Sequence, residues 1–146
     1  MNSLPRKRRG FHTPALLKEA VNALNVRPNG KYIDATIGGG GHTAEIIQRE
    51  GRVLGIDQDE AAIDFVQANS QKLIANSQKL IANSELTLVR GNFSDIEKIA
   101  RERGFEPADG ILFDIGISSY QIDSSGRGFS FLKDEPLDMR MSPDQA

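Results

Sequence analysis

The segment from Lys31 to Thr43 reads KYIDATIGGGGHT, and its pattern of residue types indicates the fold class. Residues 31–35 are short and rich in β-forming types, the glycine run 38–41 predicts a tight loop, and residues 42–47 begin a helical pattern that closes at Gly51. The glycines let the backbone approach a ligand closely, and the N–H groups at the start of the helix point to the same place. The segment therefore predicts a strand, a ligand-binding loop and a helix.

Comparable segments lie on both sides of this one. Thr13 and Pro14 predict the start of a helix over about 14–25, since threonine caps helices and proline suits the first helical position. Ser94 and Glu97 predict a capping box for a helix that stops at Gly104. Strands are expected at 52–57, 87–90 and 110–114, with a helix from about residue 59. Because apolar strands alternate with helices, the expected fold class is α/β, with a parallel sheet covered by helices on both faces.

Composition excludes several classes of protein. None of the 146 residues is cysteine, so disulfides and zinc–thiolate sites are excluded and a cytoplasmic location is expected. No apolar run approaches the ~20 residues that cross a bilayer, so no membrane association is expected. His12 and His42 are the only histidines and neither has ligand spacing to a carboxylate, so no metal site is expected.

Two segments stand apart from the domain pattern. The basic run at residues 6–9 belongs to an arm expected to be solvated and disordered, with contact to RNA phosphates as the alternative. Residues 68–74 recur without change as residues 75–81. Seven residues is close to two helical turns, so the repeat is interpreted as a tandem duplication that lengthens a helix, with looping-out as the alternative.

Three strands of the pattern end in a carboxylate: Asp34, Asp57 and Asp114. In an open parallel sheet, ligands bind beyond the carboxyl ends of the strands, so the three acids are expected to converge on one crevice. Asp34 favours a ligand with positive charge, such as the amino group of S-adenosylmethionine (SAM), over a pyrophosphate. At ~4 Å and an effective dielectric near 20 that choice is worth about 4 kcal/mol. Asp57 suits a ribose diol, which SAM shares with NAD.

Other ligands fit the glycine loop less well. Thr43 stands where a dinucleotide fingerprint has its third glycine, and the loop lacks the Lys-Ser/Thr pair of a triphosphate site. An NAD-dependent oxidoreductase and a catalytically inactive RNA or protein interaction module stay open as alternatives. Ser118 and Ser119 are expected to form a turn, because no nucleophile elbow surrounds them.

An ordered set of motifs resembles the RsmH/MraW family of bacterial SAM-dependent 16S ribosomal RNA (cytosine-N4)-methyltransferases. The motifs occupy residues 12–19, 34–43, 55–59, 91–93, 114–123, 127–131 and 136–141. The resemblance implies SAM as cofactor and 16S rRNA of the small subunit as partner; a homodimer is considered as the assembly. Carried over position by position, it places cofactor contacts at Gly40, Gly41, His42, Asp57, Phe93, Asp114 and Gln121, to which the charge argument adds Asp34.

The resemblance also bears on catalysis. Asp114 is the candidate catalytic residue, as acceptor of a hydrogen bond from the cytosine amine. Tyr120 and Phe129 are candidate platforms for a base drawn out of its stack, with plain loop packing as the alternative. Tyr120 stands where the family commonly has proline.

Members of the family are much longer than this chain. The resemblance therefore implies a Rossmann-like class I SAM-dependent methyltransferase fold that is incomplete, with about four of seven strands and the last of them an uncovered apolar edge. The expected division is a basic disordered arm at 1–11, the N-terminal part of the SAM-binding domain at 12–141, and the start of an inserted domain at 142–146. By itself the chain is expected to bind SAM weakly and to methylate poorly.

Overall fold

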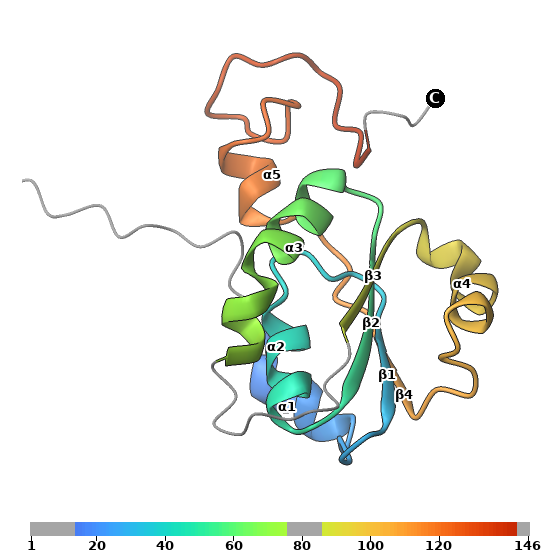
Figure 1. The fold of residues 1–146 in the computed structure, drawn as a ribbon. Coiled ribbons are helices and arrows are strands. Elements are labelled where there is room, and N and C mark those ends of the chain that lie inside the picture. The colour runs from blue at the N-terminus through green and yellow to red at the C-terminus, as the bar shows by residue number, and fades with distance from the viewer. Residues whose placement is uncertain (1–13, 76–85, 143–146) are drawn as a thin grey trace, which may run out of the picture.

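A parallel sheet forms the centre of the structure, a computed structural model that describes residues 14–75 and 86–142. Within those ranges the strands are β1 (Lys31–Asp34), β2 (Arg52–Asp57), β3 (Leu86–Arg90) and β4 (Gly110–Leu112). They lie in the order β3-β2-β1-β4, and every neighbouring pair is parallel (Figure 1). The chain thus moves outward from β1 to β3 and then crosses to the other side of β1. The strand order reverses between β1 and β4, where an open α/β sheet binds ligands.

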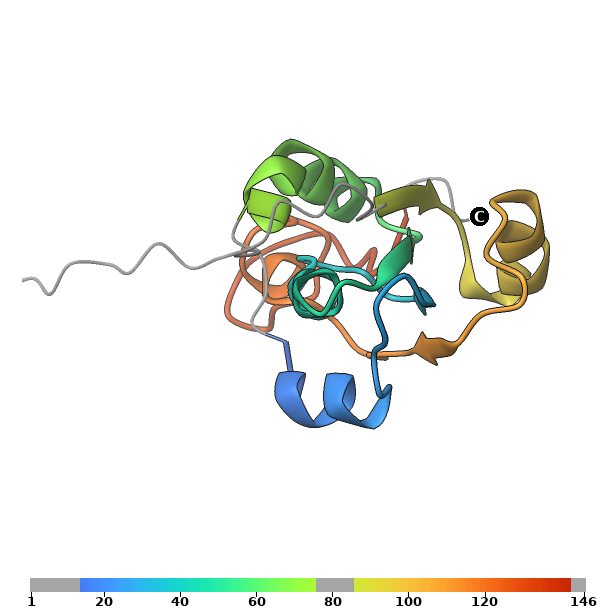
Figure 2. The same ribbon diagram turned by 60° about the horizontal axis from the view of Figure 1, so that its bottom comes forward.

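Helices cover both faces of this sheet, as the sequence predicts. The helices α1 (Leu17–Ala23), α2 (Gly41–Gln48) and α3 (Glu60–Ala75) lie on one face, and α4 (Ile96–Glu102) lies on the other (Figures 1 and 2). A 3₁₀ turn, η1 (Phe93–Asp95), precedes α4, and the short helix α5 (Ser119–Asp123) follows β4. The α/β class and the parallel sheet are confirmed.

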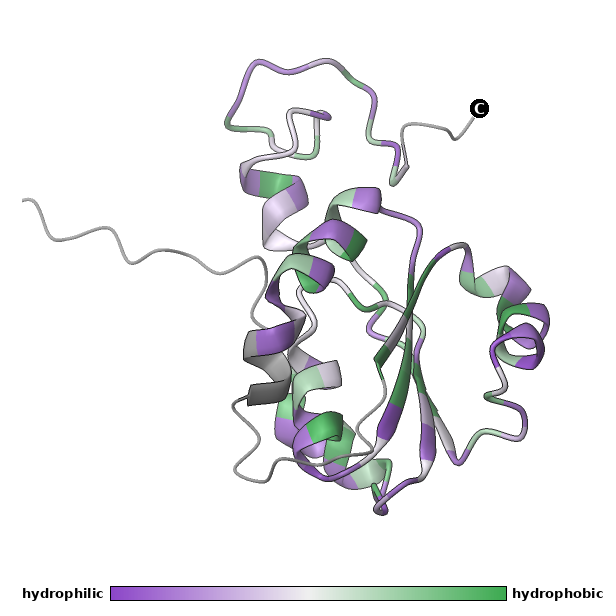
Figure 3. Cartoon of the chain, viewed as in Figure 1, coloured by the Kyte–Doolittle hydropathy of each residue, from purple (hydrophilic) through white to green (hydrophobic). Residues whose placement is uncertain are grey.

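The core is divided between the two faces by the alternation of side chains along the strands. Tyr32 and Val53 pack with residues of α1 and α2, while Ile33 and Leu54 pack with residues of α4. All four side chains are buried. Burying one such side chain stabilises the fold by about 1.5–3 kcal/mol. Figure 3 shows the hydrophobic residues concentrated on the strands and on the helix faces turned toward them.

Two predicted helix starts are wrong. Helix α1 begins at Leu17, because Leu16 adopts a left-handed conformation (φ 48°) that interrupts any helix from Pro14. Pro14 packs instead on the glycine loop: a Cβ atom at Gly41 would lie 2.4 Å from its Cγ. The capping box expected at residues 94–97 does not form: Ser94 lies in η1, where Asn92 accepts its N–H (3.0 Å), and α4 begins only at Ile96.

A capping box does form at the start of α5, where the sequence suggests only a turn. Ser118 accepts the N–H of Gln121 at 3.1 Å, and the side chain of Gln121 accepts the N–H of Ser118 at 2.7 Å. These two hydrogen bonds fix the position of Gln121 relative to the loop that leaves β4.

Strand β4 lies at the edge of the sheet and ends two residues earlier than expected. Ile111 and Phe113 are 45% and 47% exposed, so the expected uncovered apolar edge is present. The arm at residues 1–11, His12 and the second heptad copy beyond Ala75 lie outside the described residues. Among the helices that are described, none combines the length and the hydropathy that a bilayer crossing requires.

Candidate functional site

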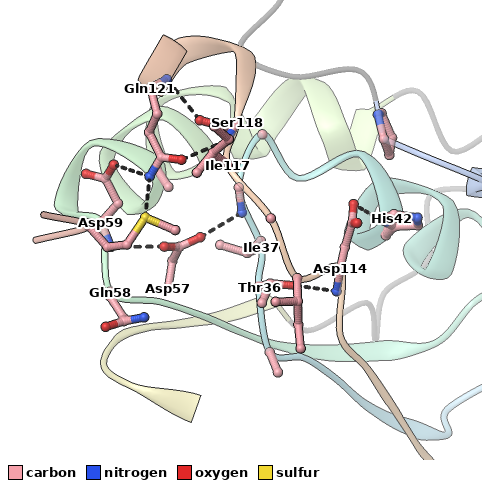
Figure 4. A pocket seen from close by; sticks show the side chains of 18 of the residues that line it. Thr36, Ile37, His42, Asp57, Gln58, Asp59, Asp114, Ile117, Ser118 and Gln121 are labelled. Carbon is pink, nitrogen blue, oxygen red and sulfur yellow. Dashed lines mark hydrogen bonds and ion pairs between the residues drawn. The ribbon is translucent and has the colours of Figure 1, made fainter. Parts of the chain in front are cut away.

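A cavity of about 410 Å³ opens beyond the carboxyl ends of the strands, at the point where the strand order reverses. This volume falls in the range of about 300–1,000 Å³ that small-molecule sites occupy. The loops that follow β1, β2 and β4 form its walls, together with the start of α2 and Gln121 of α5 (Figure 4). Its lining includes Thr36, Gly41, His42, Asp57, Asp59, Phe93, Asp114, Gln121 and Met141.

The glycine loop gives this cavity a wall of backbone. Gly38 and Gly40 have φ values of 48° and 76°, which only glycine adopts without strain. The loop turns directly into α2, which begins at Gly41. The first N–H groups of a helix have no partner within the helix and carry part of its positive dipole. This wall can therefore bind an anionic group such as a carboxylate.

Asp57 joins the glycine loop to the end of β2. Its carboxylate accepts the N–H of Gly38 and the N–H of Asp59, each at 2.9 Å. Burial raises the pKa of Asp57 above its ordinary value, and the two backbone bonds act in the opposite direction. The side chain lies at the cavity, with its orientation fixed by both bonds. It can accept further hydrogen bonds, because each carboxylate oxygen has two lone pairs.

Asp34 lies beneath the glycine loop and not in the cavity lining. It is 1% exposed, and its carboxylate accepts the Thr43 hydroxyl at 2.7 Å and the N–H of Thr36 at 3.4 Å. Burial raises its pKa to about 6. Asp34 thus ties β1 to the first turn of α2, an arrangement different from the direct ligand contact expected from the sequence. Gly40 also stands outside the lining, as the residue that precedes α2.

Asp114 and His42 form the opposite side of the cavity from Asp57 (Figure 4). The N–H of Asp114 donates to the hydroxyl of Thr36 at 2.7 Å, which connects the end of β4 to the end of β1. The Asp114 carboxylate lies 3.9 Å from Nδ1 of His42. Nε2 of His42 lies 3.2 Å from the carbonyl of Ala15. A carbonyl can only accept, so Nε2 carries a proton and donates it.

Phe93 and Gln121 complete the set of cofactor residues expected from the sequence. The ring of Phe93 meets that of Phe113 edge to face, with centroids 5.7 Å apart, and so is held at the cavity. Nε2 of Gln121 donates to the carboxylate of Asp59 and to the sulfur of Met141, both at 3.3 Å. Six of the eight cofactor residues expected from the sequence therefore line one cavity: Gly41, His42, Asp57, Phe93, Asp114 and Gln121.

The sequence reasoning missed Thr36, Asp59 and Met141 as lining residues, although each lies inside a motif of the family resemblance. Of the two candidate base platforms, Phe129 is 7% exposed and packs beneath the Arg127 guanidinium, whose Cζ lies 5.8 Å from the centroid of the phenyl ring. Loop packing, the stated alternative, describes it. Tyr120 lies in α5, outside the cavity lining. Across residues 14–75 and 86–142, no three histidine or acidic side chains form a group that could hold a metal ion.

The segment after α5 depends on a glycine at residue 128. We expect Gly128→Ala to loosen residues 126–142 more than Gly126→Ala does. Both glycines have positive φ (78° and 66°), so alanine costs about 1–2 kcal/mol in backbone strain at either position. A Cβ atom at Gly128 would also lie 2.1 Å from the carbonyl oxygen of Pro136, whereas one at Gly126 meets nothing within 4 Å. Limited proteolysis with mass spectrometry measures cleavage in this segment; equal rates in the two variants would contradict the expectation.

The sheet has the strand order of Rossmann-like folds, with a glycine loop leading into a helix and an acid at the end of the second strand. These features place the chain in the class of α/β domains whose crevice is built for a nucleoside-type ligand. Comparison with known proteins makes the assignment specific. The chain belongs to the MraW methylase family, whose model matches residues 9–146. The resemblance found in the sequence is confirmed.

Curated relatives carry the name ribosomal RNA small subunit methyltransferase H. That of Lactiplantibacillus plantarum is 44% identical over 92% of this chain and 41% of its own length. That of Symbiobacterium thermophilum is 48% identical over 89% of this chain and 39% of its own length. The chain thus spans about two fifths of the length of these relatives. A crystal structure described as that of an rRNA-methylase candidate from Clostridium thermocellum matches 59% of this chain with 22% identity and a TM-score of 0.46.

Proposed function

We propose that this chain supplies the cofactor-binding part of an enzyme that transfers a methyl group from SAM to the exocyclic N4 amine of a cytidine in 16S rRNA. The observation that carries the proposal is the single cavity that gathers Gly41, His42, Asp57, Phe93, Asp114 and Gln121 in a chain of the MraW methylase family. The small ribosomal subunit is the proposed partner and the cytoplasm the proposed location. The division at residues 11 and 141 stays a prediction.

The residues present fit this cofactor. The first turn of α2 offers N–H groups to the methionine carboxylate, Asp57 can accept from the ribose hydroxyls, and Phe93 can pack on the adenine. An aromatic contact of that kind adds about 0.5–1.5 kcal/mol beyond the burial of area. When bound, SAM supplies a methyl group on a positively charged sulfur. Asp34 is proposed to act on the site indirectly, by holding the first turn of α2 through Thr43.

Asp114 is the proposed catalytic residue. The lone pair of the cytosine amine is delocalised into the ring, so an acceptor for one of its protons increases the electron density on nitrogen. The backbone of Asp114 is fixed by the Thr36 hydroxyl, and its carboxylate faces the cavity. General acid–base assistance of this type typically contributes 10²–10⁴-fold to a rate.

Ligand preference tests the proposal against its alternatives. We expect S-adenosylhomocysteine to raise the thermal unfolding temperature of the chain, and NADH to leave it unchanged. Preferential stabilisation by NADH would support the oxidoreductase, and binding of 16S rRNA without either ligand would support the inactive interaction module. Transfer of labelled methyl groups to small ribosomal subunits measures the activity itself. The homodimer also stays a prediction, which light scattering at increasing concentration checks.

A further inference from the structure

A largely buried ion pair at the edge of the cavity joins two segments far apart in the sequence. Nη2 of Arg127 lies 2.5 Å from Oδ2 of Asp59, and the two side chains are only 14% and 6% exposed. Nη1 of the same guanidinium donates to the carbonyl of Met141 at 2.8 Å and to that of Arg140 at 3.2 Å. Arg127 therefore connects the turn at residues 139–142 to Asp59, which lies between β2 and α3.

Two of the residues that Arg127 contacts, Asp59 and Met141, belong to the wall of the cavity. Nε2 of Gln121 bridges the Asp59 carboxylate and the Met141 sulfur. The N–H of Met139 donates to the main-chain carbonyl of Arg127 at 2.6 Å, so both the backbone and the guanidinium of Arg127 hold the turn. Met141 can keep its place beside Gln121 only while the turn stays in this position.

Stabilisation does not explain this arrangement by itself. Removing a cation and a carboxylate from water is costly, and apolar side chains of similar volume often stabilise a fold as well as a buried ion pair does. The planar guanidinium, by contrast, can donate to a carboxylate and to main-chain carbonyls at once in a fixed geometry. That geometry suits the positioning of one segment against another.

We propose that Arg127 is a positioning residue: through its ion pair with Asp59 it holds Met141 against Gln121 and so fixes one wall of the cofactor cavity. The effect on cofactor affinity rests on the proposed function, whereas the placement of Met141 does not. The two parts can therefore be tested separately.

Methionine methyl groups report the placement directly, because the chain has three methionines. In protein labelled with [methyl-¹³C]methionine, Met141→Leu identifies the Met141 signal. We expect Arg127→Gln to move this signal toward that of the exposed Met139 and to weaken S-adenosylhomocysteine binding about tenfold. Arg49→Gln is the matched control: Arg49 also pairs with a carboxylate (Glu45, 2.9 Å) and donates to a carbonyl, but it lies outside the cavity lining. It should lower stability without moving the Met141 signal.

A second variant keeps the test decisive if Arg127→Gln fails to fold. Asp59→Asn removes the ion pair, while asparagine can still accept the N–H of Ala61 that Asp59 accepts at 3.1 Å. It should move the Met141 signal as Arg127→Gln does. An unmoved Met141 signal in either folded variant overturns the proposal. If the wild-type chain binds S-adenosylhomocysteine, unchanged affinity in the variants overturns it as well. If the wild-type chain binds no S-adenosylhomocysteine but the signal moves, the positioning role stands and the proposed function fails.

Discussion

Replacement of Asp57 by alanine is expected to weaken S-adenosylhomocysteine binding by about 1.5–3 kcal/mol, the scale of a hydrogen bond to a charged group. This corresponds to a roughly 10- to 150-fold higher dissociation constant. The carboxylate is oriented toward the cavity by the N–H groups of Gly38 and Asp59, so it can bind a ribose hydroxyl without reorganisation. Isothermal titration calorimetry on the purified chain measures the change.

Asp109→Ala provides the matched control for this prediction. Asp109 also accepts a backbone N–H, that of Lys31 at 2.8 Å, but it lies at the opposite end of the strands, before β4 begins. Its removal should leave the affinity unchanged. Unchanged affinity in Asp57→Ala, or an equal loss in both variants, would contradict the assignment of Asp57 to the ribose.

The sheet could be predicted because its strands carry their own signal. Residues 52–57 form a short apolar run bounded by turns, and the structure places β2 there without any change of boundary. Parallel strands then bring their carboxyl ends to one edge, which is why Asp57 and Asp114 could be assigned to a shared site from the sequence.

Helix starts were harder to predict, because several local hydrogen-bonding arrangements compete within a few residues. Ser94 can serve as an N-cap, but here its N–H is accepted by Asn92, only two residues away. The direction of a side chain at the end of a strand also depends on its three-dimensional surroundings. Asp34 turns toward Thr43, between β1 and α2, and the sequence contains no mark of that direction.

The pair formed by Asp59 and Arg127 shows a different limit. The two residues belong to separate family motifs, and nothing in their spacing indicates that they meet. They meet because the segment that follows β4 returns over the start of α3. Figure 1 shows α5 and the loop after it beside that end of α3. The resemblance marks both motifs, but only the structure explains why they occur together.

Asp34 should make the fold less stable as the pH rises from about 4 to about 7. Burial raises its pKa from 3.8 to about 6 in the folded state, so folding favours the protonated carboxyl. This contribution is complete below pH 3.8, falls as the pH rises through about 6, and is absent above that. A gap of about two pH units in a fully buried group corresponds to about 3 kcal/mol in the free energy of unfolding.

Asp34→Asn isolates this effect from that of every other carboxyl group. Asparagine has nearly the same shape, stays neutral at all these pH values and can still accept the Thr43 hydroxyl. Urea unfolding at pH 4 and pH 7.5 measures the free energy of unfolding of both chains. The difference between the variant and the wild-type chain should shift by about 3 kcal/mol in favour of the variant from the lower to the higher pH. Parallel pH profiles would show that Asp34 does not titrate in this window.

The Thr43 hydroxyl supplies a further check, because its effect on the pKa of Asp34 is opposite to that of burial. It donates to Asp34 at 2.7 Å and so stabilises the ionised form, which lowers the pKa. Thr43→Val removes the donor and keeps the volume, so the loss of stability should occur at higher pH than in the wild-type chain. Since Thr43 belongs to the first turn of α2, the same variant connects the charge beneath the glycine loop to the helix that forms the cavity wall.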